Sequence, residues 1–134
     1  MPTPFGPQLV GETEKTLGAL LRRILDGTGL SEPQWVTLRL ADLLEGQVEP
    51  SGFSAAVADR AHFADADELV DELARRGLLA DGRLTAAGRQ LLTDTQARAA
   101  DLTGPIWTGF ADADVAATTR VLNEVVARGR ALLA

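Results

Sequence analysis

The sequence contains no cysteine and a single histidine, His62. Without cysteine the chain has no disulfide, no thiol nucleophile and no thiolate metal site. A histidine-based metal site would need carboxylates or a second subunit. Aromatic residues amount to only 4%, so the core is built mostly from Leu, Val and Ala, which suits helices. The chain has no apolar run of 18 residues and no charged N-terminal region followed by an apolar one. We therefore expect a cytoplasmic protein that binds no membrane, no metal and no cofactor.

The 134 residues are enough for one domain, and 46% of them are hydrophobic, which is sufficient for a core. Twelve arginines stand against one lysine, a bias typical of a GC-rich bacterial genome. The net charge of −6 counts against tight non-specific binding to nucleic acid, because that binding depends on cations that contact phosphates. It does not exclude a local basic patch.

The N-terminal part predicts an arm and two helices. Residues 1–8 contain three prolines and are expected to be flexible or extended. A first helix is expected from about Glu12 to Asp26, with an apolar stripe of leucines and isoleucine. Ser31 is placed to cap a second helix and forms a capping box with Gln34. This helix is expected to end near Gly46.

The middle of the chain is the most informative part. A short helix is expected over about 53–62 and another over 64–76, where Leu69 and Leu73 share one face. Gly77 favours the left-handed backbone that ends a helix. The dipeptide Asp81-Gly82 is typical of a two-residue hairpin, because both central positions need positive φ. Helix, hairpin and helix in this order predict a winged helix-turn-helix.

The C-terminal part predicts two more helices. Thr85 is placed to cap a helix that runs to about Thr103, where Gly104-Pro105 is expected to break it. Asp112 or Asp114 is expected to cap the last helix, which runs to about Leu132. The first and last helices are amphipathic and lie outside the winged helix, and exposed apolar stripes of that size usually mark an interface. We therefore predict a mostly α fold with a small β-hairpin, flanked by N- and C-terminal dimerisation helices.

These motifs resemble those of the MarR family of regulators (the multiple-antibiotic-resistance type). In that family a recognition helix ends in Leu-Val-Asp-x-Leu-x-x-x-Gly-Leu, and a wing leads into Leu-Thr-x-x-Gly-Arg. The matching residues are Leu69, Val70, Asp71, Leu73, Gly77 and Leu78, followed by Leu84, Thr85, Gly88 and Arg89. The segment from Gly29 to Trp35 also resembles the opening of the family's second helix.

The resemblance implies one domain over 1–134. Within it, residues 31–103 form a winged-helix core, and residues 9–30 and 104–134 form the dimerisation helices. It further implies a homodimer that binds double-stranded DNA as a transcriptional regulator. A small-molecule ligand would change the spacing of the two recognition helices and so the affinity for DNA.

The resemblance also places residues near DNA. The DNA-facing positions are Arg60, Asp65, Asp67, Glu68, Arg75, Arg76 and Arg83. A recognition helix usually presents small polar or basic side chains at its N-terminal end, whereas residues 65–76 contain five acidic and two basic residues. Acidic side chains also complement a helix N-terminus. The wing contributes one cation, Arg83, and the family's pattern pairs this residue with Asp71.

The acidic charge of residues 65–76 leaves two functions open for this chain. The first is a DNA-binding regulator, and the second is a dimeric winged-helix protein that has lost DNA binding and acts through a small ligand or a protein partner. Family members bind aromatic ligands in a cleft, where Trp35, Arg39 and His62 are the candidates here. The other interpretation makes Trp35 a core or interface residue and His62 a partly buried or surface residue. Acidic pairs such as Asp65 and Asp67 lie on different helical faces, so the two carboxylates cannot act together as a catalytic pair. We therefore expect that this chain is not an enzyme.

Overall fold

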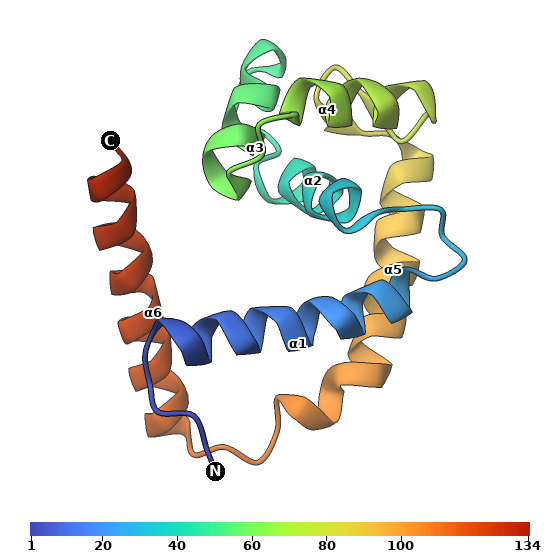
Figure 1. Ribbon diagram of the computed structural model, residues 1–134. Helices are drawn as coiled ribbons and strands as arrows, with labels where there is room; N and C mark the ends of the chain where they lie inside the picture. Colours follow the sequence, from blue (N-terminus) through green and yellow to red (C-terminus); the bar gives the residue numbers. More distant parts are fainter. The chain divides into compact units, whose positions relative to one another are not determined.

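The computed structural model describes residues 1–134 and is mostly helical with one small antiparallel sheet (Figure 1). The α-helices are α1 (Pro7–Leu25), α2 (Glu32–Leu43), α3 (Phe53–Ala61), α4 (Ala66–Arg75), α5 (Ala86–Thr103) and α6 (Asp112–Leu133). The strands are β1 (Leu79–Ala80) and β2 (Arg83–Leu84), and the short 3-10 helices are η1 (Pro50–Gly52) and η2 (Gly104–Ile106). The predicted fold class is confirmed. The chain divides into a first unit, Met1–Leu102, and a second unit, Thr103–Ala134.

The first helix begins earlier than the sequence predicted. Helix α1 starts at Pro7 rather than Glu12, so the last residues of the expected arm are helical. The proline ring fixes a helical φ at the first position, where the missing N–H costs nothing. The backbone N–H of Val10 already donates to the carbonyl of Gly6 at 3.1 Å.

The second helix begins as predicted. Ser31 Oγ accepts from the backbone N–H of Gln34 at 3.2 Å, and Gln34 Oε1 accepts from the backbone N–H of Ser31 at 2.9 Å. Both bonds of the capping box are therefore present. The box fixes the start of α2 beside the loop that leaves α1.

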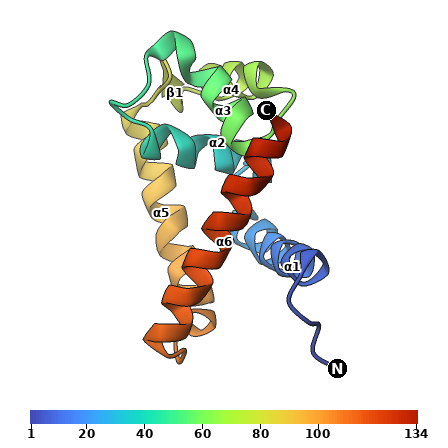
Figure 2. The same cartoon turned by 90° about the vertical axis from the view of Figure 1, so that its left-hand side faces the viewer.

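The core of the first unit lies among α2, α3 and α4, which pack on one another and on the hairpin (Figures 1 and 2). Leu38 of α2, Val57 of α3 and Leu73 of α4 are each fully buried. Burying such a side chain contributes roughly 1.5–3 kcal/mol. Helix α5 leads away from this core in both views, and Leu92 is its residue in the core cluster.

The hairpin that forms the wing is short. Leu79 pairs with Leu84 and Ala80 with Arg83. Asp81 has a φ of 52° and Gly82 a φ of 71°, which confirms the predicted turn with two left-handed positions.

Thr85 caps α5 as predicted, and the helix begins at Ala86. Thr85 Oγ1 accepts from the backbone N–H of Gly88 at 3.0 Å and donates to the carbonyl of Gly77 at 2.6 Å. Arg89, in the first turn of α5, donates to Glu45 at 2.9 Å and to Asp42 at 3.2 Å. These hydrogen bonds raise the pKa of Arg89 above its usual value. The wing and α5 are thus tied to each other and to the end of α2.

The second unit contains η2 and α6. Helix α5 ends at Thr103, so the predicted break at Gly104-Pro105 is confirmed. The prediction that Asp112 or Asp114 caps the last helix is wrong. Its N-cap is Ala111, which has no side-chain acceptor, and both aspartates lie in the first turn, where they complement the helix dipole.

Candidate nucleic-acid interface

Helix α4 has one buried and one exposed face. Ala66, Leu69 and Leu73 are buried in the first unit, and they follow the helical period that the sequence showed. The preceding helix α3 ends at Ala61, and its C-cap residue His62 takes a left-handed conformation with a φ of 58°. This turn sets the direction of α4 and leaves its polar side chains in solvent.

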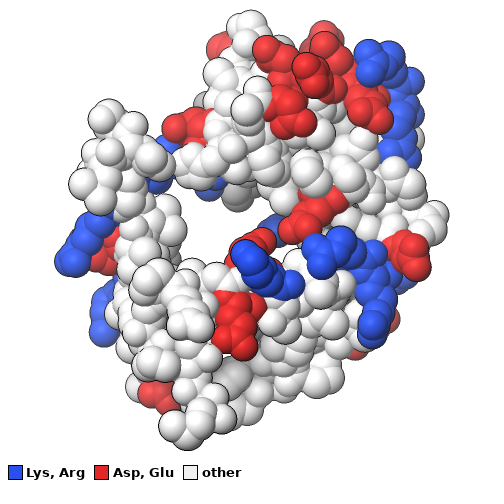
Figure 3. Space-filling model, in the orientation of Figure 1, with Lys and Arg blue, Asp and Glu red and all other residues white.

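The exposed face of α4 is strongly acidic. Its four carboxylates, on Asp67, Glu68, Asp71 and Glu72, and that of the N-cap residue Asp65 are all exposed. None of the five forms an ion pair or hydrogen bond within the chain. Figure 3 shows acidic side chains gathered over α4, with basic side chains toward its C-terminal end. Carboxylates without nearby cations repel phosphates, at a cost of about 1 kcal/mol per close contact in water.

The predicted DNA-facing cations are all exposed, but they differ in what they touch. Arg60, Arg75 and Arg83 have no partner within the chain, so they are available to an anion. Arg76 instead donates to the backbone carbonyls of Gly29 and Thr28.

The ion pair expected between Asp71 and Arg83 is absent. Arg83 lies in β2, beside the tight turn, and its side chain is exposed. The family's pattern for this pair therefore does not hold here. The side chains of Asp71 and Arg83 are both exposed to solvent.

The tip of the wing lies on the core. A Cβ atom added to Gly82 would be 3.0 Å from Cβ of Phe53 and 3.2 Å from the carbonyl oxygen of Pro50. The turn therefore touches the start of α3. A wing in this position does not project far from the first unit.

The three residues predicted for a ligand cleft lie in different surroundings. Trp35 is buried in the core, with 4% of its surface exposed. Arg39 and His62 are exposed, on α2 and at the end of α3. The structure thus favours the reading of Trp35 as a core residue and His62 as a surface residue.

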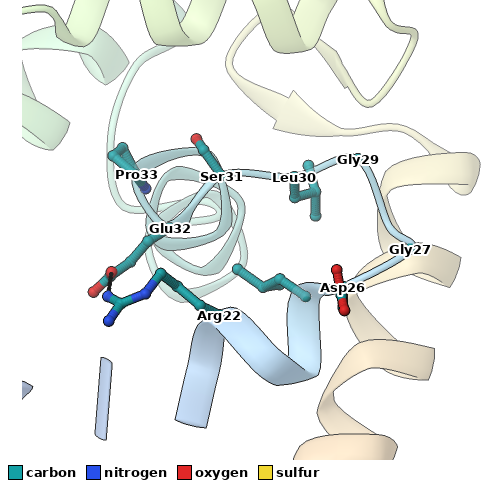
Figure 4. A pocket seen from close by; sticks show the side chains of 9 residues that line it. Arg22, Asp26, Gly27, Gly29, Leu30, Ser31, Glu32 and Pro33 are labelled. Carbon is teal, nitrogen blue, oxygen red and sulfur yellow. Dashed lines mark hydrogen bonds and ion pairs between the residues drawn. The ribbon is translucent and has the colours of Figure 1, made fainter. Parts of the chain in front are cut away.

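An open pocket of about 550 Å³ lies at the junction of α1 and α2 (Figure 4). Arg22 and Glu32 form an ion pair at 3.4 Å on one side of it, and loop residues including Asp26, Gly27 and Gly29 line another side. The sequence analysis missed these residues. The signal in the sequence that could have found this turn is its two glycines, Gly27 and Gly29, which favour the end of a helix.

The structure has no group of three or more His, Asp or Glu side chains arranged to hold a metal ion. None of its helices has both the length and the apolar character needed to cross a membrane.

No protein-family model and no curated protein sequence matches this chain. Its fold does match solved structures. CouR from Rhodococcus jostii RHA1, whose crystal structure has p-coumaroyl-CoA bound, superposes with a TM-score of 0.71 and 25% identity over 87% of this chain and 88% of CouR. A MarR family transcriptional regulator from Rhodococcus sp. RHA1 gives a TM-score of 0.68 and 26% identity, over 87% of this chain and 89% of the other.

A MarR family protein from Bacillus stearothermophilus shares the fold, with a TM-score of 0.56 and 24% identity over 93% and 98% of the two chains. This chain therefore has the MarR-like winged-helix fold that the motifs indicated. Its neighbours are transcriptional regulators and not enzymes, in agreement with the prediction that this chain is not an enzyme.

Proposed function

We propose that this MarR-like protein is a homodimeric transcriptional regulator that binds double-stranded DNA through its first unit. The observation that carries the proposal is the extent of the likeness. The fold superposes on those of two regulators over 87% of this chain, with TM-scores of 0.71 and 0.68. Such a regulator acts in the cytoplasm, where bacterial DNA lies.

The proposed dimer is supported by the surface of α6. This helix has 22 residues and no buried residue. It exposes a stripe of apolar side chains: Val115, Val121, Leu122, Val125, Val126, Leu132 and Leu133. Helices gain most of their stability from packing of an apolar face, and a second copy supplies such packing in a closed, symmetric arrangement.

Sedimentation velocity tests the dimer. The wild-type protein is expected to sediment as a dimer at micromolar concentration. In a symmetric interface Val126→Glu places two carboxylates in apolar surroundings, so the dissociation constant should rise by at least about thirtyfold. Arg120→Glu, on the opposite side of α6, is the control and should leave the dimer intact. A wild-type monomer would refute this part of the proposal.

Binding to DNA is tested by fluorescence polarisation with mixed genomic duplexes over a salt series. A regulator should bind its site with a dissociation constant of about 10⁻⁸ M or below, and its affinity should fall steeply with salt. Nuclease protection of an intergenic duplex would then locate the site.

A second function is favoured by one observation, the unpaired carboxylates of α4. They make the helix that should enter the major groove repel phosphates. The second candidate is therefore a dimer that has lost DNA binding and acts through a small ligand or a protein partner. An intact dimer with no DNA affinity, even at low salt, would support it over the first.

The role of α4 itself is tested by neutralising two of its carboxylates. If α4 faces DNA, the double variant Asp67→Asn and Glu68→Gln should bind more tightly, by about fivefold per carboxylate. Asp101→Asn, in α5, removes an exposed carboxylate elsewhere and serves as the control. An equal gain per carboxylate removed in the two variants would mean that only net charge matters and that α4 does not face DNA.

We further propose that the protein responds to a small organic anion, by analogy with the p-coumaroyl-CoA bound to CouR. Arg39 and His62 are the exposed candidates for its contacts, whereas Trp35 would contribute only if the core opened. Calorimetry with p-coumaroyl-CoA and with coenzyme A alone tests this class of ligand. Loss of affinity in Arg39→Gln would support the assignment, and no heat with either compound would contradict it.

A further inference from the structure

Arg76 joins two parts of the first unit that are distant in sequence. It lies at the C-terminal end of α4, and its side chain reaches the loop between α1 and α2. Nη1 donates to the carbonyl of Gly29 at 3.0 Å, and Nη2 donates to the carbonyl of Thr28 at 3.4 Å. A guanidinium presents its donors in a rigid, planar fork, so it holds two adjacent carbonyls at once.

The loop that receives these bonds is ordered by its own contacts. Thr28 Oγ1 donates to the carbonyl of Leu25 at 2.6 Å and accepts from the N–H of Leu30 at 3.0 Å. The N–H of Thr28 also donates to the Leu25 carbonyl, at 2.9 Å. The same loop is one wall of the open pocket, where Figure 4 shows Gly29 and Leu30 beside the start of α2. Its two carbonyls are thus presented to Arg76 by a preformed turn.

We propose that Arg76 is a positioning residue, which couples the α1–α2 loop to the end of α4, so that a displacement of the loop moves α4. The neighbouring residue, Arg75, is exposed and has no partner in the chain. The two arginines therefore differ in role although the sequence places them side by side. The inference deepens the proposed function, because α4 is the helix proposed to face DNA, but its test needs no DNA.

Hydrogen exchange in the full-length protein tests the coupling. Exchange of the Thr28 and Leu30 amides reports opening of the loop. Arg76→Gln is expected to raise it by about fivefold, the effect of losing one net hydrogen bond. Arg76→Lys keeps the charge but not the fork, so it should raise exchange as well. Arg75→Gln is the matched control and should leave it unchanged.

A second pair of variants tests the coupling from the loop toward α4. Gly27 and Gly29 both have positive φ, +82° and +75°, so alanine strains the backbone at either position. Only at Gly29 would the added Cβ meet Arg76, 3.2 Å from Nη2. Gly29→Ala should therefore raise exchange of the Gly77 and Leu78 amides at the end of α4 by at least about twofold over Gly27→Ala. This excess should vanish when Arg76→Gln is also present.

Four results would overturn the inference. The first three are unchanged loop exchange in Arg76→Gln, an equal rise in Arg75→Gln, and equal effects of Gly27→Ala and Gly29→Ala on α4. A uniform rise across all core amides, matched by a fall in global stability in urea, would also overturn it, because Arg76 would then be an ordinary stabilising residue. Failure to bind DNA leaves each of these readouts intact, so the two proposals fail separately.

Discussion

Gly88 allows α5 to lie against the wing, and replacing it should loosen both. A Cβ atom added at this position would be 3.0 Å from the carbonyl carbon of Leu78 and closer still to its oxygen. Ordinary contacts of a Cβ atom begin at 3.4 Å. Both partners are backbone, so neither yields by a simple side-chain rotation. Gly88→Ala must therefore push the helix and the wing apart.

The magnitude follows from two opposing effects. Overpacking of this kind costs about 3 kcal/mol at the upper end of its range, while alanine favours a helix over glycine by about 1 kcal/mol. We expect a net loss of about 2 kcal/mol in the free energy of unfolding, measured in urea at fixed protein concentration. The carbonyl of Leu78 also accepts from the N–H of Thr85 at 3.1 Å, so the Thr85 amide should exchange faster.

The control is Gly11→Ala, also within a helix, where an added Cβ meets nothing within 4 Å. It should stabilise the protein by up to about 1 kcal/mol. The reasoning would be refuted if Gly88→Ala were as stable as the wild type and its Thr85 amide equally protected. That result would mean that the wing moves freely relative to α5.

Three further changes test the fold in the same urea assay. Thr95 is fully buried and its hydroxyl has no hydrogen-bond partner, so Thr95→Val should stabilise the protein by about 1 kcal/mol; a loss of stability would show that the hydroxyl is satisfied. His62 holds a left-handed conformation, so His62→Gly should stabilise by about 0.5 kcal/mol, and a destabilised variant would argue for a contact made by the imidazole. Ser31→Ala should cost about 1 kcal/mol through loss of its cap, whereas Ser54→Ala within α3 should change stability by less than about 0.5 kcal/mol.

The local signals in the sequence predicted most of the fold. Ser31, Thr85 and the pair Asp81-Gly82 act on residues only a few positions away, so their roles could be inferred without a structure. The start of α1 and the cap of α6 were missed for a related reason. Proline and aspartate are each compatible with more than one position near a helix start, and only the surrounding backbone decides which one they take.

The candidate site was harder to predict, because its geometry depends on contacts across the chain. The sequence grouped Arg75 and Arg76 as DNA-facing cations, yet Arg76 bonds a loop 47 residues away. The exposure of the acidic face of α4 followed from the helical period, but the lack of any partner for Asp71 did not. Trp35 is equally plausible in a cleft or a core until its neighbours are known.

In the proposed complex with DNA, the contact between Gly82 and Phe53 limits the length of duplex that the protein can reach. A hairpin that rests on its own domain stabilises the fold, and in the proposed complex it would not reach the flanking minor groove. The proposal therefore predicts a footprint confined to the segment under α4. Lengthening the hairpin at Asp81 would be the direct way to extend the stretch of duplex that the proposed regulator contacts.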